Sequence, residues 1–367
     1  MTTTRKRLDP SVFDLPVEKM RAGWYTDAYF NYTREALRYD GRKPHVLMQV
    51  FQKRHAYLGG MDEAIAILKL CADDFDALTV NALYDGDEIE PYEPVLTIEG
   101  DYTTFAHLET VYLGTLARRT LITTNVVNVL RAANGKPVIF MPARHDHHRV
   151  QTGDGYAAYV AGQIVGAPVG VTTDEQASWW GGIGLGTVPH ALIAAYGGNT
   201  VLAATKFVEN VDAAMNVTVL VDFENDSVRT ALEVANALGP RLWGVRLDTS
   251  EALVDESLWN ELGDFAPTGV NPRLVWKVRS ALDAAGYRDV RIVVSGGFTV
   301  EKIRDFERHD VPVDAYGVGS SLIRGSNDFT GDIVVTDGKP SAKVGRHLRP
   351  GIDVVRANDL GGYRAAR

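Results

Sequence analysis

The sequence contains one cysteine, Cys71, and no long apolar run. A single cysteine excludes an internal disulfide and a four-thiolate metal site. Without about 18 consecutive apolar residues, no transmembrane helix is expected. The basic start MTTTRKRLDP lacks the apolar core of a secretory signal, so we expect a cytoplasmic protein. Internal repeats and Lys/Arg stripes are also missing, and we therefore expect neither nucleic acid nor a membrane as a partner.

What is present is ordinary globular composition over 367 residues, with 45% hydrophobic and 23% charged residues. The formal net charge is −9, from 38 Lys and Arg against 47 Asp and Glu. At roughly 150 residues per domain, this length predicts two domains. We place the N-terminal domain at residues 1–130 plus 330–367 and the second domain at residues 131–329.

The N-terminal region reads as mixed α/β. Helical periodicity covers Met61–Asp73 and Phe105–Leu130, and Thr103 or Thr104 is the expected N-cap of the second helix. Alternation at Val95–Glu99 predicts a strand between the two helices.

From about residue 137, short β-branched runs alternate with amphipathic helices. The expected strands are Val138–Met141, Thr218–Phe223, Trp243–Leu247, Arg291–Val294 and Tyr316–Val318. The expected helices are Ser227–Leu238, Pro272–Ala285 and Thr299–Arg308. This alternation predicts parallel βαβ units, in an open sheet or a barrel. Polar residues at five strand ends favour a (β/α) barrel with its active site on that face.

The sequence of the tail predicts a strand at Asp332–Val335, a turn at Asp337–Pro340 and a second strand at Lys343–Arg346. We expect these segments to pack back on the N-terminal part.

Two glycine loops follow neighbouring strands, VVSGGF at Val293–Phe298 and YGVGSSL at Tyr316–Leu322. Glycine lets the backbone approach an anion, and the following helix offers free N–H groups. A phosphate is often bound by the loops after the last two barrel strands. The alternative is a pair of ordinary tight turns. The candidate phosphate-binding residues are Ser295, Gly296, Gly297, Gly317, Gly319 and Ser320.

Two aspartates, Asp222 and Asp248, stand at strand ends, and Arg246 precedes the second by two residues. A carboxylate there can accept hydrogen bonds from sugar hydroxyls, hold Mg²⁺ that is bound to phosphate, or stabilise a developing cation. The alternative is helix N-capping. The motif GTVPHAL contributes Thr187 and His190; the histidine could serve as nucleophile, base or phosphate partner, or be a capping or core histidine.

Two further segments are candidates for ligand contact. ARHDHHR puts Arg144 and His145 just after a strand, where an anion site is favoured over a metal site because no acidic or cysteine partner recurs at ligand spacing. AGWYTDAYF, which includes Tyr29, reads as core or interface packing, or as a stacking platform for a flat substrate.

The ordered motifs resemble the nicotinate phosphoribosyltransferases, in the shorter, archaeal-type branch. The matching stretches are TDAYF, DGDEIEPYEPVLTIEG with HLETVYLG, the arginine after the next strand, GTVPHALI, VRLDTSE, VSGGF, YGVGSSL and KVGR. Together they span roughly residues 20 to 350, and GTVPHALI is the most specific.

The resemblance implies an α/β protein: an incomplete (β/α) TIM-like barrel with an N-terminal α/β sandwich domain completed by the C-terminal segment. It implies a homodimer whose active sites are lined by both subunits. The implied reaction joins nicotinate to phosphoribosyl pyrophosphate (PRPP), giving nicotinate mononucleotide and pyrophosphate in NAD biosynthesis. Coupled ATP hydrolysis and Mg²⁺ belong to that expectation.

The resemblance also implies roles for particular residues. His190 matches the histidine that ATP phosphorylates, and Asp248 the aspartate that faces the ribose. Arg144 matches the first arginine of an Arg-Arg pair, and Tyr29 the tyrosine that stacks on the pyridine ring from the neighbouring subunit. Gly296, Gly297, Gly319 and Ser320 match the 5′-phosphate loops.

The chain departs from the family pattern Phe-Gly-x-Arg-Arg, because it reads Met141-Pro142-Ala143-Arg144-His145. This departure bears on the recognition of nicotinate, because histidine replaces the second arginine of the pair. Quinolinate phosphoribosyltransferase, which decarboxylates its substrate and uses no ATP, is the first alternative. A phosphosugar-binding protein without turnover is the second.

Overall fold

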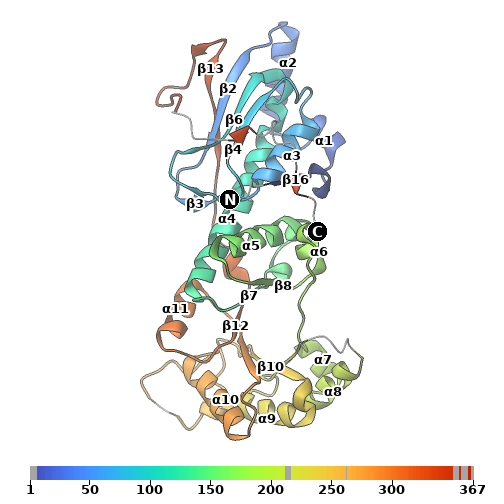
Figure 1. Ribbon diagram of the computed structural model, residues 1–367, viewed down its shortest axis with the longest axis vertical. Coiled ribbons are helices and arrows are strands. Elements are labelled where there is room, and N and C mark those ends of the chain that lie inside the picture. Colours follow the sequence, from blue (N-terminus) through green and yellow to red (C-terminus); the bar gives the residue numbers. More distant parts are fainter. Residues whose placement is uncertain (1–5, 211–215, 262, 350–354, 357–362, 365–367) are drawn as a thin grey trace.

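The computed structural model describes residues 6–210, 216–261, 263–349, 355–356 and 363–364. Figure 1 shows an elongated molecule with an antiparallel sheet at one end and helices α7 to α10 at the other. No helix within these ranges is long and apolar enough to cross a membrane. The expected division into domains stays a prediction, and its segments 1–5 and most of 350–367 lie outside the described residues.

The helices lie as follows: α1 (Val17–Arg21), α2 (Ala28–Tyr39), α3 (Met61–Cys71), α4 (Glu109–Ala132), α5 (Gln151–Val165), α6 (Asp174–Ala177), α7 (His190–Ala195), α8 (Thr200–Asn210), α9 (Ser227–Leu238), α10 (Pro272–Ala284) and α11 (Val300–Arg308). The first eight strands are β1 (Arg7–Leu8), β2 (His45–Phe51), β3 (Ala56–Tyr57), β4 (Thr79–Ala82), β5 (Glu88–Ile89), β6 (Pro94–Asp101), β7 (Val138–Phe140) and β8 (Val169–Val171). The others are β9 (Val217–Leu220), β10 (Leu242–Leu247), β11 (Arg291–Val294), β12 (Ala315–Val318), β13 (Thr330–Thr336), β14 (Lys339–Pro340), β15 (Val355–Arg356) and β16 (Tyr363–Arg364).

The N-terminal sheet is antiparallel between its neighbours, in the order β14-β13-β2-β6-β4-β15. Its buried side chains share one apolar cluster with residues of α3 and α4. Strand β13 pairs with β2, with Ile333 opposite Met48, so the predicted return of the tail to the N-terminal part is confirmed. The wider sandwich arrangement stays a prediction.

Two local predictions are wrong. The segment Lys343–Arg346 is a turn, not a strand, and the second strand of the hairpin is the short β14. Helix α4 begins at Glu109 behind two short 3-10 turns, so neither Thr103 nor Thr104 is its N-cap. Thr103 instead takes part in the turn that Asp101 caps, donating its hydroxyl to that carboxylate.

The second sheet is parallel, with the strand order β8-β7-β12-β11-β10-β9, and it curls as a half-barrel. Its core is a continuous apolar cluster that includes side chains from α9, α10 and α11. Strands β9, β11 and β12 are short and almost entirely buried, which explains their largely apolar sequences. The expected strands and helices of this region are confirmed to within a few residues at each end.

An irregular segment joins the two edges of this sheet. Leu185 N donates to Val171 O of β8 (2.7 Å), and Val188 N donates to Thr218 O of β9 (2.8 Å). Backbone groups at both edge strands are therefore partly satisfied by the segment that leads into α7.

Candidate active site

Polar residues and glycines follow five of the parallel strands, at the carboxyl ends of these strands. Because neighbouring strands all run the same way, their carboxyl ends lie on one face of the half-barrel. The residues are Arg144 and His145 after β7, Asp222 after β9, Asp248 after β10, Ser295, Gly296 and Gly297 after β11, and Gly319 and Ser320 after β12; Gly317 lies within β12.

Four of the predicted residues form a hydrogen-bonded group that we call the Asp248 network: Thr187, Arg246, Asp248 and Ser295. Ser295 Oγ donates to Asp248 Oδ1 (2.6 Å) and accepts from Arg246 Nε (2.7 Å). Arg246 Nη2 lies 3.3 Å from Asp248 Oδ2, and its Nη1 lies 3.5 Å from Thr187 Oγ1. Both oxygens of the Asp248 carboxylate are thus fixed by protein groups.

The strand geometry explains part of this network. Arg246 and Asp248 are two residues apart at the end of β10, and side chains at this spacing point to the same face of a sheet. Ser295 follows the neighbouring strand β11 and donates its backbone N–H to Leu247 O (2.9 Å). The hydroxyl of Ser295 is therefore held beside the carboxylate of Asp248.

A second pair, His190 and Asp222, lies next to the network. His190 Nε2 is 3.0 Å from Asp222 Oδ1; the carboxylate is buried, whereas the imidazole is 42% exposed. The hydrogen bond to Asp222 raises the pKa of His190 above its ordinary value, against the lowering effect of partial burial. The charge of Asp248 also raises this pKa and that of Arg246 lowers it, so charges of the network act on His190.

The backbone places the histidine. Val188 forms a parallel bridge to Val219 of β9, and Pro189 then stands at the N-cap of α7, whose first residue is His190. This register brings the imidazole to the end of β9, where Asp222 follows the strand. Asp222 is not the N-cap of α9, since Asp226 caps that helix, so the capping alternative does not apply to Asp222.

The glycine loops are tightly packed against neighbouring side chains. Gly297 has φ +67°, and a side-chain carbon there would collide with Oε1 of Glu251. At Gly319, the same carbon would stand 3.0 Å from His145 Nε2. Glycine at both positions therefore leaves room for the side chain beside the loop, Glu251 at Gly297 and His145 at Gly319.

Two predicted residues stand apart from the network. Arg144 is exposed in the turn after β7, and its guanidinium makes no hydrogen bond within the described ranges. Tyr29 is 59% exposed on α2 and bonds Asp27 (3.3 Å). Figure 1 places α2 at the opposite end of the molecule from α7, so Tyr29 does not reach the network of its own chain.

Sequence reasoning missed two groups at the glycine loop after β11, Glu251 and Lys302. Lys302 Nζ donates to Gly296 O (3.3 Å), and Glu251 covers Gly297. Their only sequence signal is position: Glu251 comes three residues after Asp248, and Lys302 lies in the first turn of the helix behind the loop.

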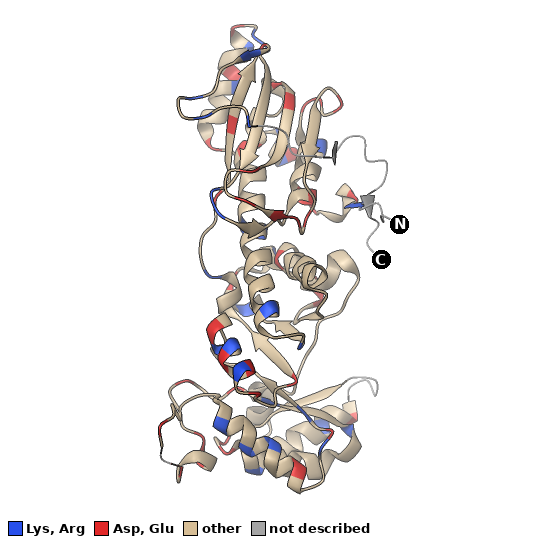
Figure 2. Ribbon diagram, turned by 60° about the vertical axis from the view of Figure 1, so that its left-hand side comes forward, with Lys and Arg blue, Asp and Glu red and all other residues tan. Residues whose placement is uncertain are grey.

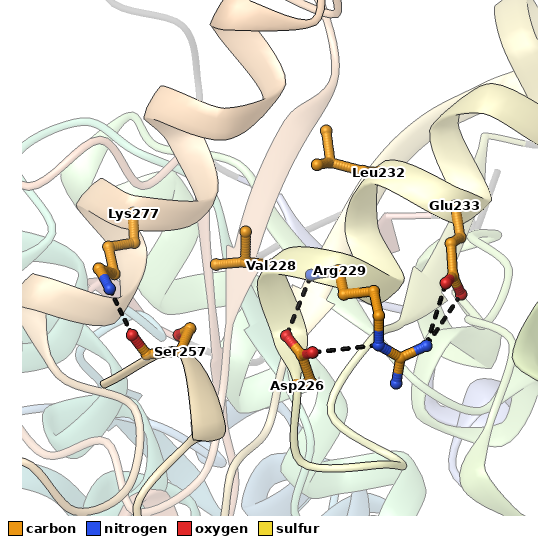
Figure 3. A pocket seen from close by; sticks show the side chains of 7 residues that line it. All are labelled: Asp226, Val228, Arg229, Leu232, Glu233, Ser257 and Lys277. Carbon is orange, nitrogen blue, oxygen red and sulfur yellow. Dashed lines mark hydrogen bonds and ion pairs between the residues drawn. The ribbon is translucent and has the colours of Figure 1, made fainter. Parts of the chain in front are cut away.

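Two further features bear on ligand binding: the arrangement of possible metal ligands and a cavity away from the glycine loops. In the part of the chain that the structure describes, no group of three or more His, Cys, Asp or Glu side chains is arranged to hold a metal ion. A cavity of about 540 Å³ lies on the outer side of the half-barrel between α9 and α10 (Figure 3). Its charged residues are paired, because Arg229 binds Asp226 and Glu233 and Lys277 binds Glu261 outside the lining, so the described residues leave little charge there for a ligand.

Comparison with known proteins connects this geometry to a family. Residues 27–120 match the family described as quinolinate phosphoribosyl transferase, N-terminal domain. The nicotinate phosphoribosyltransferase pncB1 of Mycobacterium tuberculosis is 31% identical over 276 residues, 72% of this chain and 55% of that protein. The nicotinate phosphoribosyltransferase of Bacillus subtilis is 24% identical over 66% of this chain and 45% of that protein. The chain thus spans about half the length of the curated relatives it matches.

Solved structures extend the match to nearly the whole chain. The nicotinate-nucleotide pyrophosphorylase of Pyrococcus furiosus is 33% identical, with a TM-score of 0.78 over 94% of this chain and 86% of that chain. Human nicotinic acid phosphoribosyltransferase shares the fold, with a TM-score of 0.61 at 19% identity over 86% of this chain and 75% of that chain. The chain belongs to the nicotinate/quinolinate phosphoribosyltransferase family.

Proposed function

We propose that this protein is a nicotinate phosphoribosyltransferase of NAD biosynthesis that couples its reaction to ATP hydrolysis. The pyridine nitrogen attacks C1 of PRPP, the bond from C1 to the pyrophosphate oxygen breaks, and nicotinate mononucleotide and pyrophosphate leave. The observation that carries this proposal is the contact of His190 with Asp222 beside the Asp248 network, since it supplies a nucleophile for ATP next to a charge suited to the ribose.

Asp248 is suited to the sugar centre. Departure of pyrophosphate leaves positive charge at C1 and the ring oxygen, and a fixed carboxylate stabilises that charge without having to reorient. Ser295 and Arg246 hold both oxygens of Asp248 in place. The glycine loops would anchor the 5′-phosphate, so that binding energy far from C1 aligns C1 with the pyridine nitrogen.

His190 is suited to accept a phosphoryl group. The Asp222 carboxylate accepts a hydrogen bond from Nε2–H of the neutral imidazole, which leaves the lone pair on Nδ1. Nδ1 attacks the γ-phosphorus of ATP and ADP leaves with the bond's electron pair; water later hydrolyses the phosphohistidine. Asp222 stabilises the positive charge that grows on the ring as the N–P bond forms.

The residues present fit Mg²⁺ that arrives with a polyphosphate. Asp222 Oδ2 makes no hydrogen bond within the described ranges, and a carboxylate oxygen is a ligand that Mg²⁺ prefers. Mg²⁺ would neutralise charge on the pyrophosphate leaving group. Asp222 is therefore the residue that would hold it, with Arg144 as an additional cation for the anionic substrates.

We also propose a homodimer. The exposed position of Tyr29, remote from its own chain's network, supports a role at the active site of a partner subunit. Its phenol ring could stack there on the pyridine ring.

Quinolinate phosphoribosyltransferase is the second candidate, favoured by the family match at residues 27–120. One assay separates the candidates: pyrophosphate release from PRPP with nicotinate, nicotinamide or quinolinate, with and without ATP. We expect turnover with nicotinate and stimulation by ATP that His190→Ala abolishes. Turnover with quinolinate and release of CO₂ without ATP would establish the second candidate, and no turnover with any base would favour a binding protein.

A further inference from the structure

The glycine loop after β11 has a lysine behind it that no role yet explains. Lys302 lies in the first turn of α11, where its Nζ donates to Gly296 O (3.3 Å) and stands 4.5 Å from the centre of the Phe298 ring. Figure 2 shows that α11 carries both acidic and basic residues. Of these residues, Lys302 is the one whose ammonium contacts the glycine loop.

The ammonium of Lys302 is only partly compensated. It has three N–H donors and makes one hydrogen bond to a described residue, the bond to the Gly296 carbonyl. Burial lowers the pKa of Lys302 from its ordinary value, and the charge of Glu251 acts in the opposite direction. An ammonium in such surroundings is stabilised by an anion that accepts hydrogen bonds from its remaining N–H groups.

A carboxylate already lies at this loop. Glu251 occupies the space that a side chain at position 297 would need, and it acts electrostatically on Lys302. On the other side, Ser321 Oγ donates to Phe298 O (2.8 Å), which ties the loop after β12 to the loop after β11. The charges of Lys302 and Glu251 thus both lie at the loop after β11, which the loop after β12 contacts.

We infer that Lys302 is a binding residue for the phosphate monoester of a phosphorylated sugar, and that Glu251 compensates its charge while no phosphate is bound. This inference rests on the proposed function, because it assigns a cation to the 5′-phosphate end of the same site. When a phosphate binds, the remaining N–H groups of Lys302 donate hydrogen bonds to the phosphate oxygens. The carboxylate of Glu251 then opposes binding through like charge.

The test is isothermal titration calorimetry with ribose 5-phosphate, using unphosphorylated ribose to measure any contribution of the sugar alone. Lys302→Met removes the ammonium, Lys302→Arg keeps a cation, and Glu251→Gln removes the opposing charge. Arg304→Met is the matched control, because it removes a cation from an exposed position of the same helix. Far-UV circular dichroism and the melting temperature report whether each variant is folded.

We expect Lys302→Met to raise the dissociation constant for ribose 5-phosphate about tenfold or more, as loss of a charge-assisted hydrogen bond requires. Lys302→Arg should recover part of the loss, Glu251→Gln should lower the dissociation constant several-fold, and Arg304→Met should change it less than about twofold. If Lys302→Met does not fold, the Glu251→Gln and Lys302→Arg titrations still decide the matter.

Three outcomes overturn the inference: binding by Lys302→Met equal to wild type, weaker binding by Glu251→Gln, or no binding of ribose 5-phosphate by the wild type. The calorimetry needs neither nicotinate nor ATP. A protein that binds ribose 5-phosphate through Lys302 but forms no mononucleotide would refute the proposed function alone. One that forms mononucleotide and binds ribose 5-phosphate without help from Lys302 would refute this inference alone.

Discussion

The pairing of His190 with Asp222 makes the Asp222→Asn variant the most informative perturbation. Asparagine keeps the size of the side chain, and its amide oxygen can still accept a hydrogen bond from Nε2–H. It carries no charge, however, to stabilise the ring as Nδ1 forms a bond to phosphorus. General acid–base groups contribute about 10²–10⁴ in rate. Because His190 is 42% exposed and water screens the pair, we expect the lower end, a loss of about 100-fold in phosphoryl transfer to His190.

The same variant changes the dependence on pH. Asp222 raises the pKa of His190, and a protonated imidazole has no lone pair for attack, so wild-type phosphorylation should fall as the pH drops through this raised pKa. Removal of the carboxylate lowers the pKa, and the acid limb of the pH–rate profile should move to lower pH.

The assay is transfer of label from γ-³²P-ATP to the protein in a single turnover, with acid lability used to identify phosphohistidine. Glu224→Gln is a suitable control, since Glu224 lies in the same loop but pairs with Arg229 rather than with His190. An Asp222→Asn variant with the wild-type rate and an unmoved acid limb would refute the assigned role of Asp222.

Three further predictions concern other parts of the chain. Ser295→Ala should lower kcat for mononucleotide formation about tenfold, because Asp248 loses its 2.6 Å hydrogen bond but keeps its ion pair; an unchanged kcat would contradict this. Burial raises the pKa of Glu109 to about 7, so the folded protein keeps a proton that the unfolded chain loses from about pH 4.5 upward, and stability should fall as the pH rises to 7. Urea unfolding at pH 8 should accordingly show Glu109→Gln more stable than wild type by about 3 kcal/mol, with little gain at pH 4.5; equal gains at both pH values would show that ionisation is not the cause. Arg7→Met should reduce the free energy of unfolding by about 3–5 kcal/mol in the same assay, since it removes the cation that pairs with the buried carboxylate of Asp62, and a loss below about 1 kcal/mol would count against that pairing.

The second sheet could be predicted from the sequence because its strands are short, apolar and regularly followed by amphipathic helices. Ser227–Leu238 and Arg291–Val294 were located to the residue, since Asp226 caps the first and turn residues bound the second. The parallel direction of the strands then fixes which ends meet, so Asp222 and Asp248 could be expected at one edge.

The contacts beyond this framework could not be predicted. The bond between His190 and Asp222 depends on the bridge of Val188 to β9, and the sequence around Val188 has no strand pattern. Lys302 looks like any surface lysine of an amphipathic helix until the carbonyl of Gly296 is seen beside it. Thr103 has the residue type of an N-cap, but local bonding to Asp101 draws it into a preceding turn.

The pairing of β13 with β2 has a consequence for the order in which the molecule is completed during synthesis. Phe51 leaves the ribosome 279 residues before Thr330, its partner across the sheet. At a translation rate of about 5–20 residues per second, one edge of β2 waits for roughly 14 to 56 seconds. The half-barrel can condense in that interval, whereas the open edge of β2 is free to pair with another nascent chain. Slow release of β13 should therefore affect aggregation of this protein more than it affects assembly of the half-barrel.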